Sequence, residues 1–138
     1  RSVAILFIDL DGFKKVNDQH GHGAGDQLLI GIAQAMARTL RPQDLLGRLG
    51  GEEFAAVLPE VSPAEAHAMA ERLRSAVEQQ PFATAPGGQG PTQRATVSLG
   101  LVHSASMGGN ADMDTLLLAA DAALYRAKAE GRNRVALA

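Results

Sequence analysis

Apolar runs and polar, glycine-containing segments alternate along the first half of the chain. Residues 3–10, VAILFIDL, form a continuous apolar run that is typical of a strand covered on both faces. The polar segment 11–26 has room for one short helix, and residues 24–40 then repeat apolar side chains at helical spacing before Pro42. Residues 45–58 predict a strand, a Gly-Gly turn and a second strand.

The second half of the chain begins with a helix start signal. Ser62 suits an N-cap, Pro63 suits the first helical position, and Glu65 completes a capping box, so a helix is predicted over 62–80. The segments that follow are predicted, in order, as a loop, a strand, a long helix ending on a glycine and a short strand: 82–93, 94–104, 112–131 and 133–138.

The predicted order is strand, helix, helix, strand, strand, helix, strand, helix and strand. Because crossover and hairpin connections are mixed, we expect an α+β fold with a ferredoxin-like, mixed sheet flanked by helices. A chain of 138 residues is long enough for one domain with its own core. Since the chain opens directly into the first strand, we expect residues 1–138 to be the output domain of a longer protein, truncated at its N-terminus.

The composition narrows the function classes. A formal net charge of −2 argues against a general nucleic-acid binder or a membrane-surface protein. The absence of cysteine excludes disulfides, thiolate metal sites and a cysteine nucleophile, and it is compatible with a reducing compartment, so we expect a cytoplasmic protein. No apolar run in the sequence approaches the roughly 20 residues of a membrane-spanning helix.

Four acidic residues lie at or beside the ends of predicted strands. Asp9 and Asp11 end the first strand, and Glu52 and Glu53 follow the Gly-Gly turn. Neighbours on a strand point to opposite faces, so one of the two glutamates can join Asp9. Carboxylates that converge need a cation, and oxygen ligands suit Mg²⁺ or Mn²⁺ shared with nucleotide phosphates. Alternatively, the aspartates cap the following helix and the glutamates form a solvated strand end.

Three segments resemble the GGDEF-domain diguanylate cyclases: FIDLDGFKKVNDQHGHGAGDQLL, RLGGEEF and ALYRAKAEGRN. The resemblance runs from about residue 3 to residue 135. Members of this family join two GTP molecules into cyclic di-GMP and release pyrophosphate. Their fold is similar to the palm of the class III nucleotide cyclases. The resemblance therefore implies an enzyme that binds GTP, although the sequence has no P-loop pattern to hold the phosphates.

The resemblance also implies the roles of the acidic cluster. Asp9, the main-chain carbonyl of Leu10 and Glu52 would hold one or two Mg²⁺ (or Mn²⁺) ions between the nucleotide phosphates. Glu52 and Glu53 would be catalytic, with Glu53 assisting deprotonation of the 3′-hydroxyl or orienting the hairpin. Asp11 would be a helix cap or a residue that supports the metal ligands.

The resemblance assigns the guanine contacts to Asn17 and Asp26. A carboxylate can accept from guanine N1–H and the N2 amino group, and adenine would leave that carboxylate unpaired. The alternative is ordinary helix chemistry, with Asn17 ending a short helix and Asp26 in the first turn of the next. His22 is expected to hold its own turn.

The phosphate contacts implied by the resemblance come from two helix ends. Phe13 and Lys14, which open the short helix, would offer main-chain N–H groups to the terminal phosphates. Lys128 and Arg132, four residues apart at the end of the last long helix, would bind the phosphates in place of a P-loop lysine. The alternative for both is favourable charge at a helix C-terminus.

The segment RPQD, Arg41 to Asp44, matches the RxxD inhibitory site of the family, where cyclic di-GMP binds as an allosteric product inhibitor. Guanidinium groups suit both phosphate and the Hoogsteen edge of guanine. Arg72 on the following predicted helix would supply a second arginine. The alternative for Arg72 is an exposed helix residue paired with a nearby glutamate.

The resemblance implies a homodimer, because the product contains two guanylates and one such site binds one GTP. We expect this homodimer to be transient in the chain as given, with an N-terminal sensor domain in the full protein and no nucleic-acid partner. The alternative function is a non-catalytic module that senses GTP or cyclic di-GMP.

Overall fold

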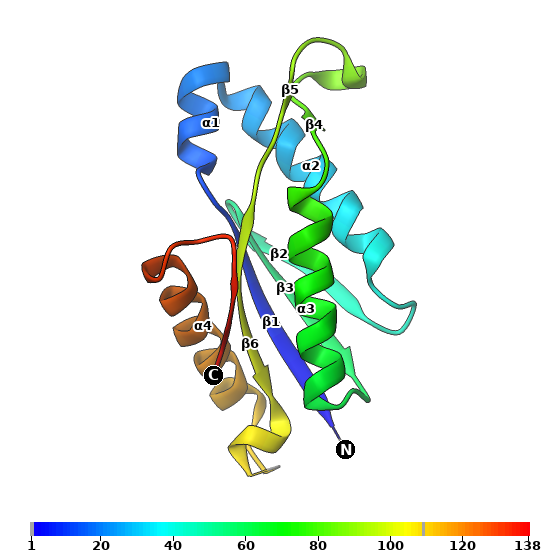
Figure 1. The fold of residues 1–138 in the computed structure, drawn as a ribbon, viewed down its shortest axis with the longest axis vertical. Helices are drawn as coiled ribbons and strands as arrows, with labels where there is room; N and C mark the ends of the chain where they lie inside the picture. The colour runs from blue at the N-terminus through cyan, green and yellow to red at the C-terminus, as the bar shows by residue number, and fades with distance from the viewer. Residues whose placement is uncertain (1, 109) are drawn as a thin grey trace.

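The strand predicted first in the sequence is the central strand of the structure. The computed structural model describes residues 2–108 and 110–138. Its five-stranded sheet has the order β2–β3–β1–β6–β7, in which β7 runs parallel to β6 and the other pairings are antiparallel (Figure 1). The strands of this sheet are β1 (Val3–Leu10), β2 (Leu45–Gly50), β3 (Glu53–Pro59), β6 (Val97–His103) and β7 (Val135–Leu137).

Helices cover both faces of this sheet (Figure 1). α2 (His22–Thr39) and α3 (Pro63–Glu78) pack on one face, and α4 (Met113–Ala129) packs on the other. Successive β1 side chains alternate between the faces: Leu6 belongs to the core under α2 and α3, and Ile5 belongs to the core under α4. The α+β class with a mixed, helix-flanked sheet is therefore confirmed.

A short helix follows β1, as predicted, and the predicted ends of the longer helices are close to the observed ones. α1 (Phe13–His20) is joined to α2 by Gly21. α3 has the predicted capping box: the Ser62 hydroxyl accepts from Glu65 N at 3.0 Å, and Glu65 Oε1 accepts from Ser62 N at 2.8 Å. The described helices lack the length and apolar character that crossing a bilayer requires. The prediction for the His22 side chain falls outside the described part of the structure.

The segment predicted as a loop contains a small two-stranded ribbon, so that prediction was wrong in part. β4 (Phe82–Ala83) pairs with β5 (Thr92–Gln93), and a 3₁₀ turn, η1 (Pro86–Gly88), joins them. Phe82 is buried against α2, where a Cβ on Gly31 would lie 2.9 Å from its ring. This one buried apolar side chain anchors the β4–β5 segment to α2. The polar, glycine-rich composition of the rest of the segment hides that signal. A second 3₁₀ turn, η2 (Ser104–Met107), follows β6.

α4 lies unusually close to the sheet at Gly100 of β6. A Cβ built on Gly100 would be 2.2 Å from the Ala120 carbonyl oxygen and 2.3 Å from Leu124 N. Real Cβ atoms essentially never approach other atoms this closely, so only glycine fits here. This contact brings the middle of α4 close to β6.

Candidate active site

Asp9 lies near the C-terminal end of β1 and faces α4. In the sheet it is directly opposite Glu53 of β3 on one side and Ser98 of β6 on the other. Directly opposed residues of antiparallel strands share a face, so Asp9 and Glu53 lie on the same side. Both residues line a depression of about 190 Å³ whose other lining residues come from α4: Asp121, Leu124, Tyr125 and Lys128.

The Asp9 carboxylate is buried and only partly satisfied. The residue is 5% exposed, and Lys128 Nζ contacts its Oδ2. Its Oδ1 is buried and has no hydrogen-bond partner among the described residues. Because an unpartnered buried carboxylate oxygen is costly, this atom fits a bound cation.

A cation on Asp9 would need further ligands besides the side chains of the described residues. The described residues contain no group of three or more His, Asp or Glu side chains placed to hold a metal ion. Mg²⁺ usually takes one or two protein carboxylates and completes its shell with water and phosphate oxygens. The chemistry of the donors therefore fits a hard ion that arrives with a phosphate ligand.

The structure distinguishes between the two glutamates of the hairpin. Glu53 is the first residue of β3, while Glu52 belongs to the turn, so the expectation that both lie on a strand was wrong. The Leu10 N–H donates to the Glu52 carbonyl at 3.2 Å, which brings the two main chains together. Glu53 is the glutamate that shares the depression with Asp9, and Glu52 lies one residue away, in the turn beside the end of β1.

The Gly-Gly turn has a backbone conformation that favours glycine. Gly50 has a φ of 145° and Gly51 a φ of 53°, and the pairing of β2 with β3 shifts between Arg48 and Gly50. L-residues rarely adopt these φ values, which accounts for the glycines. Arg48 then holds the turn, since its Nε and Nη2 donate to the Gly51 carbonyl at 2.9 and 2.6 Å.

Asp11 has a structural role that the sequence did not reveal. The N-cap of α1 is Gly12 without a side-chain cap, so of the two roles expected for Asp11 the helix cap is wrong, while support of the metal ligands stays a prediction. Its carboxylate instead accepts from Thr96 Oγ1 at 2.8 Å, from Ser98 Oγ at 2.7 Å and from Asn133 N at 3.0 Å. Asp11 thus ties the end of β1 to β6 and to the loop before β7.

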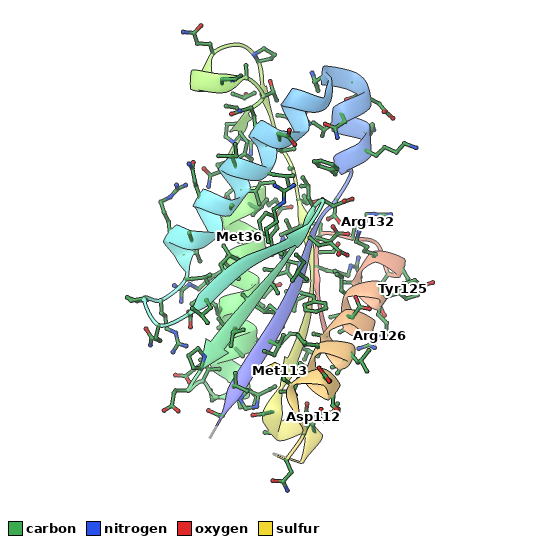
Figure 2. All side chains as sticks on the ribbon, turned by 180° about the vertical axis from the view of Figure 1, so that it is seen from behind. Met36, Asp112, Met113, Tyr125, Arg126 and Arg132 are labelled. Carbon is green, nitrogen blue, oxygen red and sulfur yellow. The ribbon has the colours of Figure 1, made fainter. Side chains whose placement is uncertain are left out.

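Lys128 and Arg132 lie at the same end of the sheet as Asp9. Lys128 is in the last turn of α4, while Arg132 lies beyond the end of the helix, in the loop to β7. In Figure 2, Arg132 and Tyr125 lie toward the end of α4 that is nearer the turn between β2 and β3. Burial lowers the pKa of Lys128, and the positive charge of Arg132 lowers it further, so the ammonium benefits from its contact with Asp9.

Asn17 and Asp26 are brought together by the α1–α2 connection. Asn17 Oδ1 accepts a hydrogen bond from Gly25 N at 3.1 Å, one residue before Asp26, which is exposed. A Cβ on Gly25 would lie 2.1 Å from Asn17 Oδ1 and 2.9 Å from the Phe13 ring. Gly25 therefore sets the position of Asn17, a role that its neighbours in the sequence do not reveal. The exposed Lys14 follows Phe13 in the first turn of α1.

The predicted inhibitory residues lie away from this site, beside α3. Arg41 and Arg72 line one depression of about 190 Å³. The fully buried Asp44 carboxylate is bound by Arg41, whose Nη2 donates to Asp44 Oδ1 at 2.6 Å and to the Pro59 carbonyl at 2.7 Å. The hydrogen bond to Asp44 raises the pKa of Arg41. The α3 ion pairs with Glu71 and Glu78 are made by Arg74 rather than Arg72.

Two residues of the depression, Asp121 and Tyr125, were not predicted. They precede Lys128 by seven and three residues, so all three lie on one side of a helix. This spacing was a usable signal, because the prediction for Lys128 already placed that side of the helix at the phosphates.

Known proteins resemble this chain over nearly all of its length. A family model described as "Diguanylate cyclase, GGDEF domain" matches residues 1–134. Response regulator PleD of Caulobacter vibrioides is 42% identical over 133 residues, which are 96% of this chain and 28% of PleD. The chain spans 28 to 41% of the length of the curated relatives that it matches.

Solved GGDEF domains have the same fold. The GGDEF domain of TpbB (YfiN) from Pseudomonas aeruginosa is 37% identical, with a TM-score of 0.88 over 99% of this chain and 77% of that one. The GGDEF domain of DgcB from Caulobacter crescentus, solved in complex with c-di-GMP, is 30% identical, with a TM-score of 0.87 and the same two coverages.

Proposed function

The chain belongs to the GGDEF diguanylate cyclase domain family, and from this premise we propose that it condenses two GTP molecules into cyclic di-GMP and two pyrophosphates. The observation that carries the proposal is the buried Asp9 carboxylate. Among the described residues one of its oxygens has no partner, it lies opposite Glu53, and it opens on a depression that Lys128 also lines. A strand end with this chemistry suits the binding of a metal-bound triphosphate.

In this proposal Asp9, the Leu10 carbonyl and Glu52 hold one or two Mg²⁺ or Mn²⁺ ions. When bound, such ions neutralise charge on the attacking and leaving oxygens of an in-line displacement at the α-phosphate. The Oδ1 of Asp9, which has no partner among the described residues, supports Asp9 as a ligand. The main-chain hydrogen bond between Leu10 and Glu52 shows that these two residues lie close together, as a shared ion requires. Glu53, which shares the depression with Asp9, accepts the proton of the 3′-hydroxyl.

Guanine is read by Asn17 and Asp26. The Asp26 carboxylate accepts from guanine N1–H and the N2 amino group, which adenine does not offer in that arrangement. Because the Asn17 oxygen already accepts from Gly25 N, its amide nitrogen is the group that donates to the base. The pairing of Asn17 with the residue next to Asp26 supports a joint role for the two side chains.

The phosphates are held by Lys128, Arg132 and the main-chain N–H groups of Phe13 and Lys14. Lys128 now contacts Asp9, and with a cation bound there its ammonium would be free to bind a phosphate oxygen. The first-turn N–H groups of α1 have no partner within the helix and suit phosphate oxygens.

Catalysis requires a second copy of the chain, because each site takes one GTP and the product contains two guanylates. Cyclic di-GMP then inhibits the enzyme at Arg41, Asp44 and Arg72. The shared depression of the two arginines supports this second site. The Arg41–Asp44 pair must open for the Asp44 carboxylate to reach a ligand, since that carboxylate is now buried under Arg41.

The test is incubation with GTP and Mg²⁺ followed by chromatography of the nucleotides. We expect cyclic di-GMP, with a rate per molecule that rises with protein concentration because two copies must meet. Asp9→Asn, Glu52→Gln and Glu53→Gln should each abolish product. The control is Glu60→Gln, at the exposed far end of β3, which should leave the rate unchanged. GTP that binds but is never converted would support the sensing module instead.

A further inference from the structure

The loop that carries Arg132 has an uncommon backbone. Arg132 has a φ of 64° and Asn133 a φ of 49°, so two consecutive residues other than glycine lie in the left-handed region. Asparagine tolerates this region better than most residues, whereas arginine rarely adopts it. Such a conformation persists only where the surrounding structure enforces it, and it is concentrated at functional sites.

Three hydrogen bonds from Asn133 to two parts of the fold hold this conformation. Its N–H donates to Asp11 Oδ2 at 3.0 Å, at the end of β1. Its Nδ2 donates to Glu78 Oε2 at 2.7 Å, and its Oδ1 accepts from Arg74 Nη1 at 3.1 Å, both on α3. The main-chain N–H of Arg132 is fixed as well, since it donates to the Ala127 carbonyl at 3.0 Å.

The partners of Asn133 are themselves held in place. Thr96 and Ser98 hydroxyls bind the two oxygens of Asp11, and Arg74 Nη1 donates to Glu78 Oε1 at 2.9 Å. The hydrogen bond from Asn133 lowers the pKa of Glu78, and the bond from Arg74 lowers it further, so this carboxylate stays ionised. Asn133 is therefore attached to α3 and to the turn after β1, where Asp11 is itself held by β6.

We infer that Asn133 is a positioning residue, which holds the Arg132 guanidinium where it meets the triphosphate. This inference rests on the proposed function, because it assigns to Asn133 the placement of a phosphate-binding group. Asn133 touches neither substrate nor metal in this scheme. A substitution of Asn133 should therefore weaken nucleotide binding only when Arg132 is present. A general contribution of Asn133 to the fold would weaken binding with or without Arg132.

The test is a double-mutant cycle read by calorimetric binding of GTP in the presence of Mg²⁺. We expect Asn133→Ala to raise the dissociation constant about tenfold, because a charge-assisted phosphate contact is misplaced. On an Arg132→Ala background the same change should alter the constant by less than about twofold. Asn110→Ala, an exposed asparagine before the other end of α4, is the matched control and should have no effect.

The outcomes separate the inference from the proposed function. Failure of the unsubstituted chain to bind GTP refutes both. If that chain binds GTP but Asn133→Ala loses equal affinity on the two backgrounds, or loses none, then the positioning role is wrong. Should Asn133→Ala not fold, Asn133→Gly gives the same test, since glycine keeps the left-handed backbone and removes both side-chain bonds.

Discussion

Gly100→Ala is the substitution that most directly probes how α4 is seated on the sheet. The new Cβ would meet the Ala120 carbonyl oxygen at 2.2 Å and Leu124 N at 2.3 Å. Both are backbone atoms of a helix, so rotating a side chain does not relieve the clash. α4 must move outward by about 1 Å, and overpacking of this kind costs about 3 kcal/mol, the upper end of the usual range.

The cost should appear in urea and thermal unfolding followed by circular dichroism. We expect the midpoint temperature to fall by about 10 °C, given a few degrees per kcal/mol for a domain of this size. Gly47→Ala is the matched control, because a Cβ on Gly47 of β2 meets nothing within 4 Å. It should be neutral or slightly stabilising. If the two variants unfold within about 0.5 kcal/mol of each other, the close approach of α4 to β6 is wrong.

Three further predictions concern other parts of the molecule. Ser62→Ala removes the capping box of α3 and should cost about 1 kcal/mol in urea unfolding; an unchanged midpoint would contradict the cap. The bond from Thr115 N lowers the pKa of Asp112, so this carboxylate stabilises the fold above its unfolded pKa and loses that effect as pH falls through its folded pKa. Between about pH 5 and pH 3 the free energy of unfolding should therefore fall less for Asp112→Asn than for the unsubstituted chain. Equal decreases would show that Asp112 does not stabilise the fold when ionised. Gly25→Ala pushes a Cβ against Asn17 and should weaken GTP binding about tenfold in calorimetry; unchanged affinity would exclude Asn17 from the guanine site.

The parts of the fold that the sequence predicts correctly have local signals. The start of α3 is one, because Ser62, Pro63 and Glu65 act within a single helical turn. The continuous apolar run of β1 is another, since helices on both faces of the sheet bury both sides of the strand. Such signals depend on neighbouring residues and need no knowledge of the final topology.

The acidic cluster was predictable only in outline. The expectation that one glutamate shares the face of Asp9 is met by Glu53, although it assumed that Glu52 also lies on the strand and did not say which of the two it would be. The answer depends on where β3 begins, and that depends on the φ values of Gly50 and Gly51 and on the shift in pairing beside them. The structure puts Glu53 opposite Asp9, while the metal-binding role of Glu52 stays a prediction.

The partners of Asp11 could not be predicted from the sequence. Thr96, Ser98 and Asn133 lie 85, 87 and 122 residues further along the chain. A rule based on neighbouring residues favours a helix cap for an aspartate in this position, and it has no means of weighing contacts that exist only after the sheet has closed. Tertiary structure overrode a local preference at this position.

The central place of β1 has a consequence for how the protein is made. Synthesis proceeds from the N-terminus, so β1 leaves the ribosome before the other strands of its sheet, and β6, which covers one of its edges, ends only at His103. Until that strand emerges, the apolar β1 keeps an open edge that can pair with other nascent chains. The interval before β6 emerges is therefore a period of aggregation risk that the stability of the finished domain does not describe.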